Sequence, residues 1–152
     1  SPKVILIVSF LFLLVTLQVL TSSFLFWPKT SYDTLFSFLG FCIFIFGFVI
    51  AVWAKLTMRG NWGVPGQHNP KRQKELVTSG PFRFSRHPIY LGLSLVFIAF
   101  SVTLRSYLIF FNLVIVWRFY QASIVEEELL TKYFGKNYLA YKEKVPRFIF
   151  YK

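Results

Sequence analysis

The chain has 152 residues, enough for one domain, and its 17 lysines and arginines stand against only 6 acidic residues. Hydrophobic residues make up 55% of the chain and aromatic residues 21%, a composition that excludes an ordinary soluble domain. The basic residues flank apolar runs, so the net charge of +11 favours a lipid bilayer over nucleic acid as the partner, and one cysteine with two histidines excludes both an internal disulfide and a structural zinc site.

Four apolar stretches predict a single domain, residues 1–152, that is an all-α integral membrane protein with about four transmembrane helices. About 20 apolar residues are needed to cross a bilayer core. The first stretch is long and no small-residue cleavage pattern follows it, so we expect a span rather than a signal peptide. Arg105 and Ser106 predict a tight turn that makes the last two spans a helical hairpin. The expected spans are 4–27, 35–56, 89–104 and 107–125.

The polar segments between and after these spans predict a loop and two further helices. Residues 57–88 begin with a stretch rich in Gly, Pro and Asn and show no helical periodicity, which predicts a loop. Residues 126–145 are amphipathic and are expected to form two C-terminal helices. Gly135 is the expected cap between these helices, and Pro146 is the expected stop after the second.

The distribution of positive charge predicts the orientation of the spans. Four spans place the N-terminus, the loop and the C-terminal tail on one side, which carries fourteen lysines and arginines, whereas the other side carries Lys29 and Arg105. Arg118 lies within the fourth span. Lysine and arginine collect on the cytoplasmic side of membrane proteins. We therefore expect loop 57–88 and the C-terminus to lie in the cytoplasm, where soluble cofactors are available.

Two polar clusters mark a candidate site on that face. Arg86, His87 and Tyr90 lie at the start of the third span, and Glu126 and Glu127 lie at the end of the fourth. Because a helical hairpin brings these two ends together, the clusters are expected to meet. A cationic pair opposite an anionic pair suits a zwitterionic ligand. The alternative is that Arg86 and a glutamate form only a structural salt bridge that anchors the hairpin.

Two linked motifs carry a resemblance to a known family. The segment G-P-F-R-F-S-R-H-P-I-Y-L-G is followed by E-E-x-x-L-x-x-x-F-G-x-x-Y-x-x-Y-x-x-x-V-P-R, and together they cover roughly residues 76–148. This pattern resembles the isoprenylcysteine carboxyl methyltransferase family and the related phospholipid methyltransferases. The resemblance implies an integral membrane enzyme that uses S-adenosylmethionine, with the loop and the C-terminal helices forming the cofactor pocket. It implies no metal site and no obligate protein partner.

The resemblance also implies roles for individual residues. The candidate catalytic residues are Arg86, Tyr90, Glu126 and Glu127. Arg147 lies in the tail that helps to cover the cofactor. The eukaryotic prenylcysteine enzymes carry an arginine shortly before the paired acids, where this chain has Ala122 and Ser123, and this departure leaves the acceptor open. The residues that match the cofactor-binding positions are Leu76, Val77, Gly80, Arg86, His87, Pro88, Tyr90, Glu126, Glu127, Tyr138 and Tyr141.

The expected reaction is methyl transfer to a lipid-like or small hydrophobic acceptor at the cytoplasmic membrane face, with a prenylcysteine-type carboxylate as one candidate. A carboxylate acceptor is already ionised and needs a cation to position it, either Arg86 or Arg118, whereas an amine or thiol would need a base such as a glutamate or Tyr90. Two alternatives remain. One is an NADPH-dependent membrane reductase of the sterol-reductase type, which shares an R-H-x-x-Y segment, and the other is a small membrane scaffold without enzymatic activity.

Overall fold

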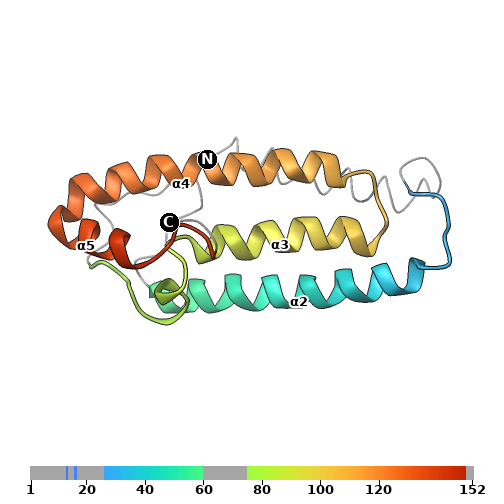
Figure 1. Ribbon diagram of the computed structural model, residues 1–152, viewed down its shortest axis with the longest axis horizontal. Helices are drawn as coiled ribbons and strands as arrows, with labels where there is room; N and C mark the ends of the chain where they lie inside the picture. The colour runs from blue at the N-terminus through green and yellow to red at the C-terminus, as the bar shows by residue number, and fades with distance from the viewer. Residues whose placement is uncertain (1–12, 14–15, 17–25, 60–74, 150–152) are drawn as a thin grey trace.

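The computed structural model describes residues 13, 16, 26–59 and 75–149, and the part of the chain that it describes is helical. Most of the expected span 4–27 and residues 60–74 of the expected loop 57–88 lie outside these residues. Figure 1 shows the long helices α2, α3 and α4 side by side, with α5 and the C-terminal segment gathered at one end. The helices are α2 (Asp33–Met58), the 3-10 helix η3 (Gly80–Arg83), α3 (Pro88–Thr103), α4 (Ile109–Phe134) and α5 (Lys136–Lys144).

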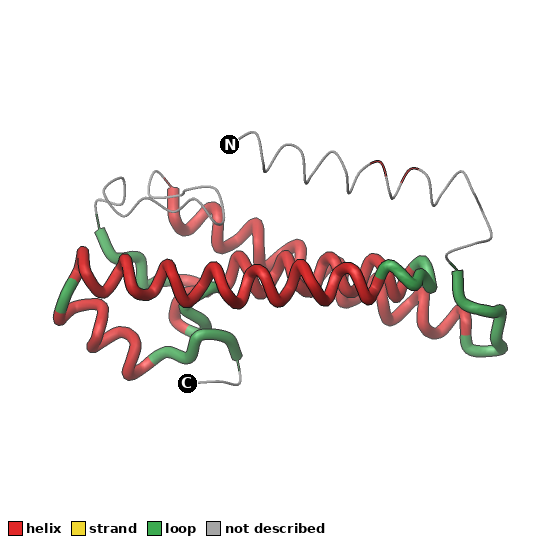
Figure 2. Tube along the Cα trace, turned by 90° about the horizontal axis from the view of Figure 1, so that it is seen from above, coloured by secondary structure: helices red, strands yellow, loops and turns green. Residues whose placement is uncertain are grey.

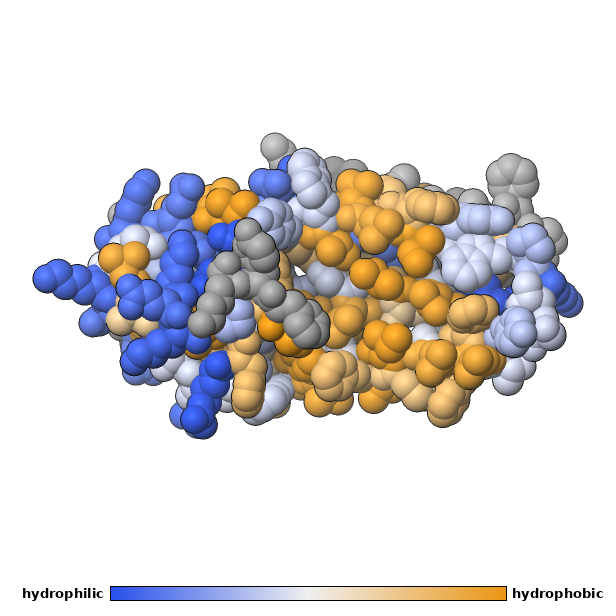
Figure 3. All heavy atoms as spheres, in the orientation of Figure 1, coloured by the Kyte–Doolittle hydropathy of each residue, from blue (hydrophilic) through white to orange (hydrophobic). Residues whose placement is uncertain are grey.

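Two of the helices are long and apolar enough to cross a membrane. They are α2 and α4, each of 26 residues, whereas α3 has 16. Only 11% of the most apolar 18-residue window of each long helix is buried, so their apolar side chains face outward rather than into a soluble core. Figure 3 shows this apolar surface over the middle of the molecule, next to a hydrophilic end that carries α5. These two helices give the chain its membrane character, and the four-span arrangement stays a prediction.

Glycines bring α2 and α3 into backbone contact. A Cβ atom built on Gly47 would lie 2.8 Å from the carbonyl oxygen of Gly92, and one built on Gly92 would lie 2.7 Å from the backbone nitrogen of Ala51. A Cβ on Gly40 would lie 2.7 Å from the backbone nitrogen of Thr103. Real Cβ atoms do not approach backbone atoms this closely, so any larger residue forces the helices apart. The two glycines of the second apolar stretch therefore fix the α2–α3 distance.

The turn between α3 and α4 forms the predicted hairpin. Arg105 adopts a positive φ of 52°, and its guanidinium pairs with the carboxylate of Asp33 at the start of α2. Inside the hairpin, the side-chain amide of Asn112 on α4 donates to the backbone carbonyl of Phe97 and to the hydroxyl of Ser101 on α3, both at 2.7 Å. These buried hydrogen bonds set the register of α4 against α3.

One predicted boundary is wrong. We expected the fourth span to end at residue 125 and a separate amphipathic helix to begin at 126, but α4 continues without a break to Phe134. No residue between 126 and 134 ends a helix, because Glu, Leu, Thr and Lys are all compatible with helical backbone. The first break is at Gly135, whose φ is 53°. The paired acids therefore lie inside α4, about two turns before its end. The second expected helix appears as α5.

Candidate functional site

A short segment ahead of α3 positions the basic cluster. Gly80 begins η3 with φ of 58°, and a Cβ atom there would lie 2.8 Å from the hydroxyl of Thr57 on α2. This close approach and the left-handed backbone both require glycine. Pro88 then occupies the first position of α3, where its missing N–H would have no partner within the helix. Arg86 and His87 consequently lie at the mouth of the α3–α4 hairpin.

Arg86 is buried and its guanidinium is fully engaged. Its Nε and Nη2 atoms donate to Oε1 of Glu127 at 3.1 and 2.9 Å. Its Nη1 atom donates to the backbone carbonyls of Val145 at 2.6 Å and Lys142 at 3.0 Å, both at the end of α5. Arg86 therefore ties α4 to the C-terminal segment, and the expected meeting of the two polar clusters takes place.

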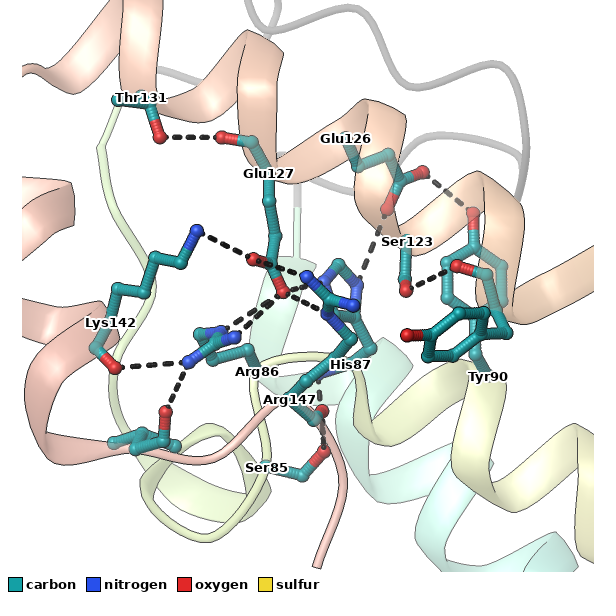
Figure 4. A network of polar contacts seen from close by, with 12 residues as sticks. Ser85, Arg86, His87, Tyr90, Ser123, Glu126, Glu127, Thr131, Lys142 and Arg147 are labelled. Carbon is teal, nitrogen blue, oxygen red and sulfur yellow. Dashed lines mark hydrogen bonds and ion pairs between the residues drawn. The ribbon is translucent and has the colours of Figure 1, made fainter. Parts of the chain in front are cut away.

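Glu127 is the centre of this network. Its side chain is 2% exposed, and Arg147 approaches it from the tail with Nε 2.8 Å from Oε1 and Nη2 3.1 Å from Oε2. Lys142 places its Nζ atom 3.2 Å from Oε2. Three cationic side chains, from the segment before α3, from α5 and from the tail, thus surround one buried carboxylate (Figure 4).

Glu126 has a different environment. The hydroxyl of Tyr90 donates to its Oε1 atom at 2.7 Å, and Nδ1 of His87 lies 3.5 Å from its Oε2 atom. The other ring nitrogen of His87, Nε2, lies 3.4 Å from Oε1 of Glu127, within ion-pair reach but outside hydrogen-bond geometry. The His87 ring packs between Tyr90 and Phe148, with centroid distances of 5.7 and 6.2 Å. His87 therefore bridges the two acids.

A pocket opens between the loop that precedes η3, the start of α3, the end of α4 and α5. Nine of the eleven predicted cofactor-binding residues line it. Gly80 instead lines a neighbouring hollow with Leu76 and Val77, and Glu127 lines another hollow on the opposite side of α4. The residues that line the pocket are Met58, Leu76, Val77, Phe82, Arg86, His87, Pro88, Ile89, Tyr90, Glu126, Leu130, Tyr138 and Tyr141.

Tyr138 brings an unused hydrogen-bonding group to the pocket. Its side chain is 1% exposed, and its hydroxyl has no partner among the described residues. Burial, reinforced by the charge of Glu127, raises the pKa of the Tyr138 phenol well above its usual value, so the group keeps its proton. The neighbouring Tyr141 hydroxyl, in contrast, donates to the backbone carbonyl of Phe82 at 2.7 Å. A buried, unsatisfied donor in a pocket is a group that a ligand or an ordered water can satisfy.

The pocket has the chemistry that S-adenosylmethionine requires. This cofactor carries an ammonium, a carboxylate, a sulfonium, ribose hydroxyls and a purine with apolar faces. The Glu126 carboxylate can pair with a cation or accept a hydrogen bond from a hydroxyl, and the Tyr138 hydroxyl can donate a hydrogen bond. The apolar walls are formed by Leu76, Val77 and Ile89. The residues present therefore fit the cofactor.

Four lining residues had not been predicted, and one candidate lies elsewhere. The four are Met58, Phe82, Ile89 and Leu130. Their apolar character carries no chemical signature, although Leu130 follows Glu126 by four residues and so shares its helix face. Arg118, which was a candidate for positioning the acceptor, is exposed on α4 and is not a lining residue.

The described part of the chain is helical, with two helices long and apolar enough to cross a membrane and a pocket with charged residues near one end. The sequence pattern of the phospholipid methyltransferase family matches residues 35–137. The chain belongs to this family.

Similar proteins carry a more specific name. The protein-S-isoprenylcysteine O-methyltransferase of Xenopus laevis is 36% identical over 122 residues, which cover 79% of this chain and 42% of that protein. The human protein of the same name is 33% identical over 124 residues, covering 80% and 44%. A probable protein-S-isoprenylcysteine O-methyltransferase of Oryza sativa subsp. indica is 33% identical over 132 residues, covering 85% and 68%. The chain thus spans less than half of the two vertebrate proteins and about two thirds of the rice protein.

Proposed function

We propose that the protein is an S-adenosylmethionine-dependent methyltransferase that modifies the carboxylate of a prenylcysteine-type acceptor at the cytoplasmic face of a membrane. The observation that carries this proposal is the pocket itself, which brings together Glu126, an apolar wall and the Tyr138 hydroxyl, which has no partner among the described residues. Family membership and the names of the similar proteins support the reaction class.

The pocket residues hold the cofactor in distinct ways. The bound cofactor supplies an activated methyl group on a sulfonium. Glu126 binds the cofactor's ammonium or ribose hydroxyls, and Tyr90 and His87 hold the Glu126 carboxylate in place. The Tyr138 hydroxyl donates one further hydrogen bond. The apolar side chains of Leu76, Val77, Ile89 and Leu130 pack against the uncharged part and keep water out.

The acceptor requires positioning rather than activation. Methyl transfer from a sulfonium is an in-line displacement, so the rate depends on holding acceptor and donor in line and in near contact. A carboxylate is ionised at neutral pH and needs no general base. The Arg86 guanidinium is occupied by Glu127 and two backbone carbonyls, so Arg118, exposed on α4 outside the pocket lining, is the remaining candidate for the cation that positions the acceptor.

The apolar surface of the helices explains why we propose an acceptor with a long apolar chain and a charged end. Apolar side chains cover the outward surfaces of α2 and α4, so a prenyl chain remains in an apolar environment while its carboxylate reaches the charged end. The charge bias supports a cytoplasmic location for that end.

Calorimetric titration of the detergent-purified protein tests the cofactor. We expect a dissociation constant on the micromolar scale for S-adenosylmethionine, a weaker one for Glu126→Gln and Tyr138→Phe, and no binding of NADPH. Binding of NADPH in place of S-adenosylmethionine would support a reductase. Binding of neither would favour the membrane scaffold without enzymatic activity. A second assay measures transfer of a labelled methyl group to an N-acetylated S-prenylcysteine. The methyl ester of the same compound is the matched control and should accept no label.

A further inference from the structure

We infer that the two adjacent glutamates have different roles: Glu126 contacts the ligand, whereas Glu127 is a positioning residue that fastens residues 145–148 over the site. We call residues 145–148 the C-terminal strap. This inference deepens the proposed function and rests on it for the identity of the ligand. The fastening itself is a property of the protein alone.

The two acids face different sides of α4. Glu126 lines the pocket, and its side chain is 14% exposed. Glu127 is 2% exposed and lines the hollow on the other side with Lys132, Lys142 and Arg147. Consecutive residues on a helix point about 100° apart, so one helix presents these two carboxylates to two different environments.

The charges around the two acids also differ: cations surround Glu127, whereas the Glu126 carboxylate has fewer charged neighbours. Both oxygens of Glu127 accept contacts from cations, Oε1 from Arg86 and Arg147 and Oε2 from Arg147 and Lys142. A cationic ligand would have to displace one of these cations to reach Glu127. Glu126 is held by a neutral hydroxyl and one histidine nitrogen, so its negative charge is available to a cationic group in the pocket.

The strap is bound to the segment that carries the basic cluster. The backbone N–H groups of Arg86 and His87 donate to the carbonyls of Pro146 at 2.9 Å and Arg147 at 3.3 Å. The hydroxyl of Ser85 donates to the same Arg147 carbonyl at 2.9 Å. The next strap residue, Phe148, then packs its ring against His87. The strap therefore forms one side of the support for the histidine that holds Glu126.

Glu127 connects this strap to α4. Arg147 makes a two-point contact with the Glu127 carboxylate, and its guanidinium also lies 5.4 Å from the centre of the Tyr120 ring on the same helix. In addition, Arg86 holds Glu127 and the carbonyl of Val145, the first strap residue, at the same time. Loss of the Glu127 charge should therefore release the strap and weaken ligand binding without the loss of any direct ligand contact.

The test compares Glu127→Gln with Glu126→Gln, a matched change at the neighbouring position. Limited trypsin digestion without ligand, followed by mass spectrometry, measures cleavage after Lys144, immediately before the strap. We expect cleavage to rise about tenfold or more in Glu127→Gln, because charge-assisted hydrogen bonds that hold the strap closed are lost. Cleavage in Glu126→Gln should stay at the level of the unaltered protein, whereas calorimetry should show weaker S-adenosylmethionine binding in both variants.

A second variant covers the case in which Glu127→Gln does not fold. Arg147→Gln removes the strap's own cation, whose side chain is 15% exposed, and leaves the Arg86–Glu127 pair intact. It should raise cleavage after Lys144 and weaken binding. If Glu127 acts through the strap, combining Glu127→Gln with Arg147→Gln should weaken binding little beyond the stronger single variant, whereas Glu126→Gln with Arg147→Gln should multiply the two losses. Glu127→Asp, which keeps the charge, should recover part of the protection.

The outcomes separate this inference from the proposed function. Weaker binding in Glu127→Gln or Arg147→Gln without increased cleavage, or equal cleavage in Glu126→Gln and Glu127→Gln, would overturn the division of roles. If the unaltered protein does not bind S-adenosylmethionine but Glu127→Gln and Arg147→Gln still release the strap, the cofactor assignment fails and Glu127 keeps its positioning role.

Discussion

At the scale of single residues, the site depends on which polar atoms are already satisfied. Arg86 and Glu127 satisfy one another and the end of α5, whereas the Tyr138 hydroxyl has no partner among the described residues. Tyr138 and Tyr141 are neighbours on α5 with opposite hydrogen-bonding states, because the Tyr141 hydroxyl reaches the Phe82 carbonyl. This contrast separates a hydroxyl that is available to the proposed ligand from a hydroxyl that is used in folding.

Removing each hydroxyl tests that contrast. Tyr138→Phe deletes a buried donor without a partner, so the ligand-free protein should keep its stability or gain up to about 1 kcal/mol, while S-adenosylmethionine binding weakens about fivefold or more. Tyr141→Phe should instead cost about 1 kcal/mol of stability, because the Phe82 carbonyl loses its donor. Thermal unfolding in detergent with and without the cofactor measures both effects. A stability loss in Tyr138→Phe as large as that in Tyr141→Phe would contradict the assignment.

The same two phenols predict a response to alkaline pH. Burial raises the pKa of both Tyr138 and Tyr141 above the ordinary value of 10.0. In the unfolded chain these groups lose their protons near that value, whereas in the folded protein they keep them to higher pH. Their contribution to stability is therefore fully present below about pH 10 and is lost as the pH rises further.

Unfolding temperatures measured between pH 8.5 and 11.5, values chosen to bracket the ordinary phenol pKa of about 10, should show this loss. The matched control is the double variant Tyr138→Phe, Tyr141→Phe, whose unfolding temperature should fall less steeply over the same interval. An identical slope in the two proteins would show that other groups cause the alkaline loss.

At the scale of helices, the bundle is held by two kinds of contact. Backbone approach at Gly40, Gly47 and Gly92 joins α2 to α3, and side-chain hydrogen bonds from Asn112 together with the Arg86–Glu127 pair join α4 to the segments around α3. The glycine contact tolerates no added volume, and the polar contact tolerates no loss of a partner.

A single added side chain should separate α2 from α3. Gly47→Val places a Cβ atom 2.8 Å from the Gly92 carbonyl, so the helices must move apart, at a cost of about 1–3 kcal/mol. Phe46→Leu, at an exposed neighbouring position, is the control and should change stability by less than about 0.5 kcal/mol. Thermal unfolding in one detergent compares the two. Equal unfolding temperatures would show that the α2–α3 contact is looser than described.

At the scale of the whole molecule, polarity is divided along the long axis. In Figure 1, α5 and the C-terminal end of α4 lie at one end, and the α3–α4 turn with the start of α2 lies at the other. The contacts of the paired acids with the basic cluster and with α5 belong to the first end. Figure 2 shows from above how α5 turns back at the first end and leads the chain toward the C-terminus. The side chains of the candidate site therefore lie at one end of the molecule.

Cysteine labelling tests the predicted membrane orientation of the end that carries α5. With Cys42 replaced by serine, a cysteine placed at Glu143, exposed on α5, should react with a membrane-impermeant thiol reagent only from the cytoplasmic side. A cysteine at Ser31, exposed just before α2, should react only from the opposite side. The measurement uses intact cells and inverted vesicles. Labelling of both positions from the same side would contradict an odd number of crossings between them.

The sequence was sufficient to predict the meeting of the two polar clusters, because a hairpin of two apolar stretches joined by a short turn leaves little freedom at its open end. It was not sufficient to predict which acid faces the pocket, since that depends on the rotation of α4. The partners of Arg86 at Val145 and Lys142 are backbone carbonyls, which leave no mark on the residue types. The end of α4 was misplaced because a change from apolar to polar residues is not a change of backbone conformation.

The uninterrupted course of α4 makes spacing part of the site. Asn112, which fixes the helix against α3, and Glu126, which faces the pocket, are separated by 14 residues, about 3.9 turns, so both lie toward α3. Inserting one residue between them would rotate everything beyond it by about 100° and carry Glu126 away from the pocket. Inserting four would nearly restore the facing but move the acids about 6 Å along the axis. The number of residues between Asn112 and Glu126 therefore decides whether Glu126 faces the pocket. A chain with a site of this design has to keep that number unchanged.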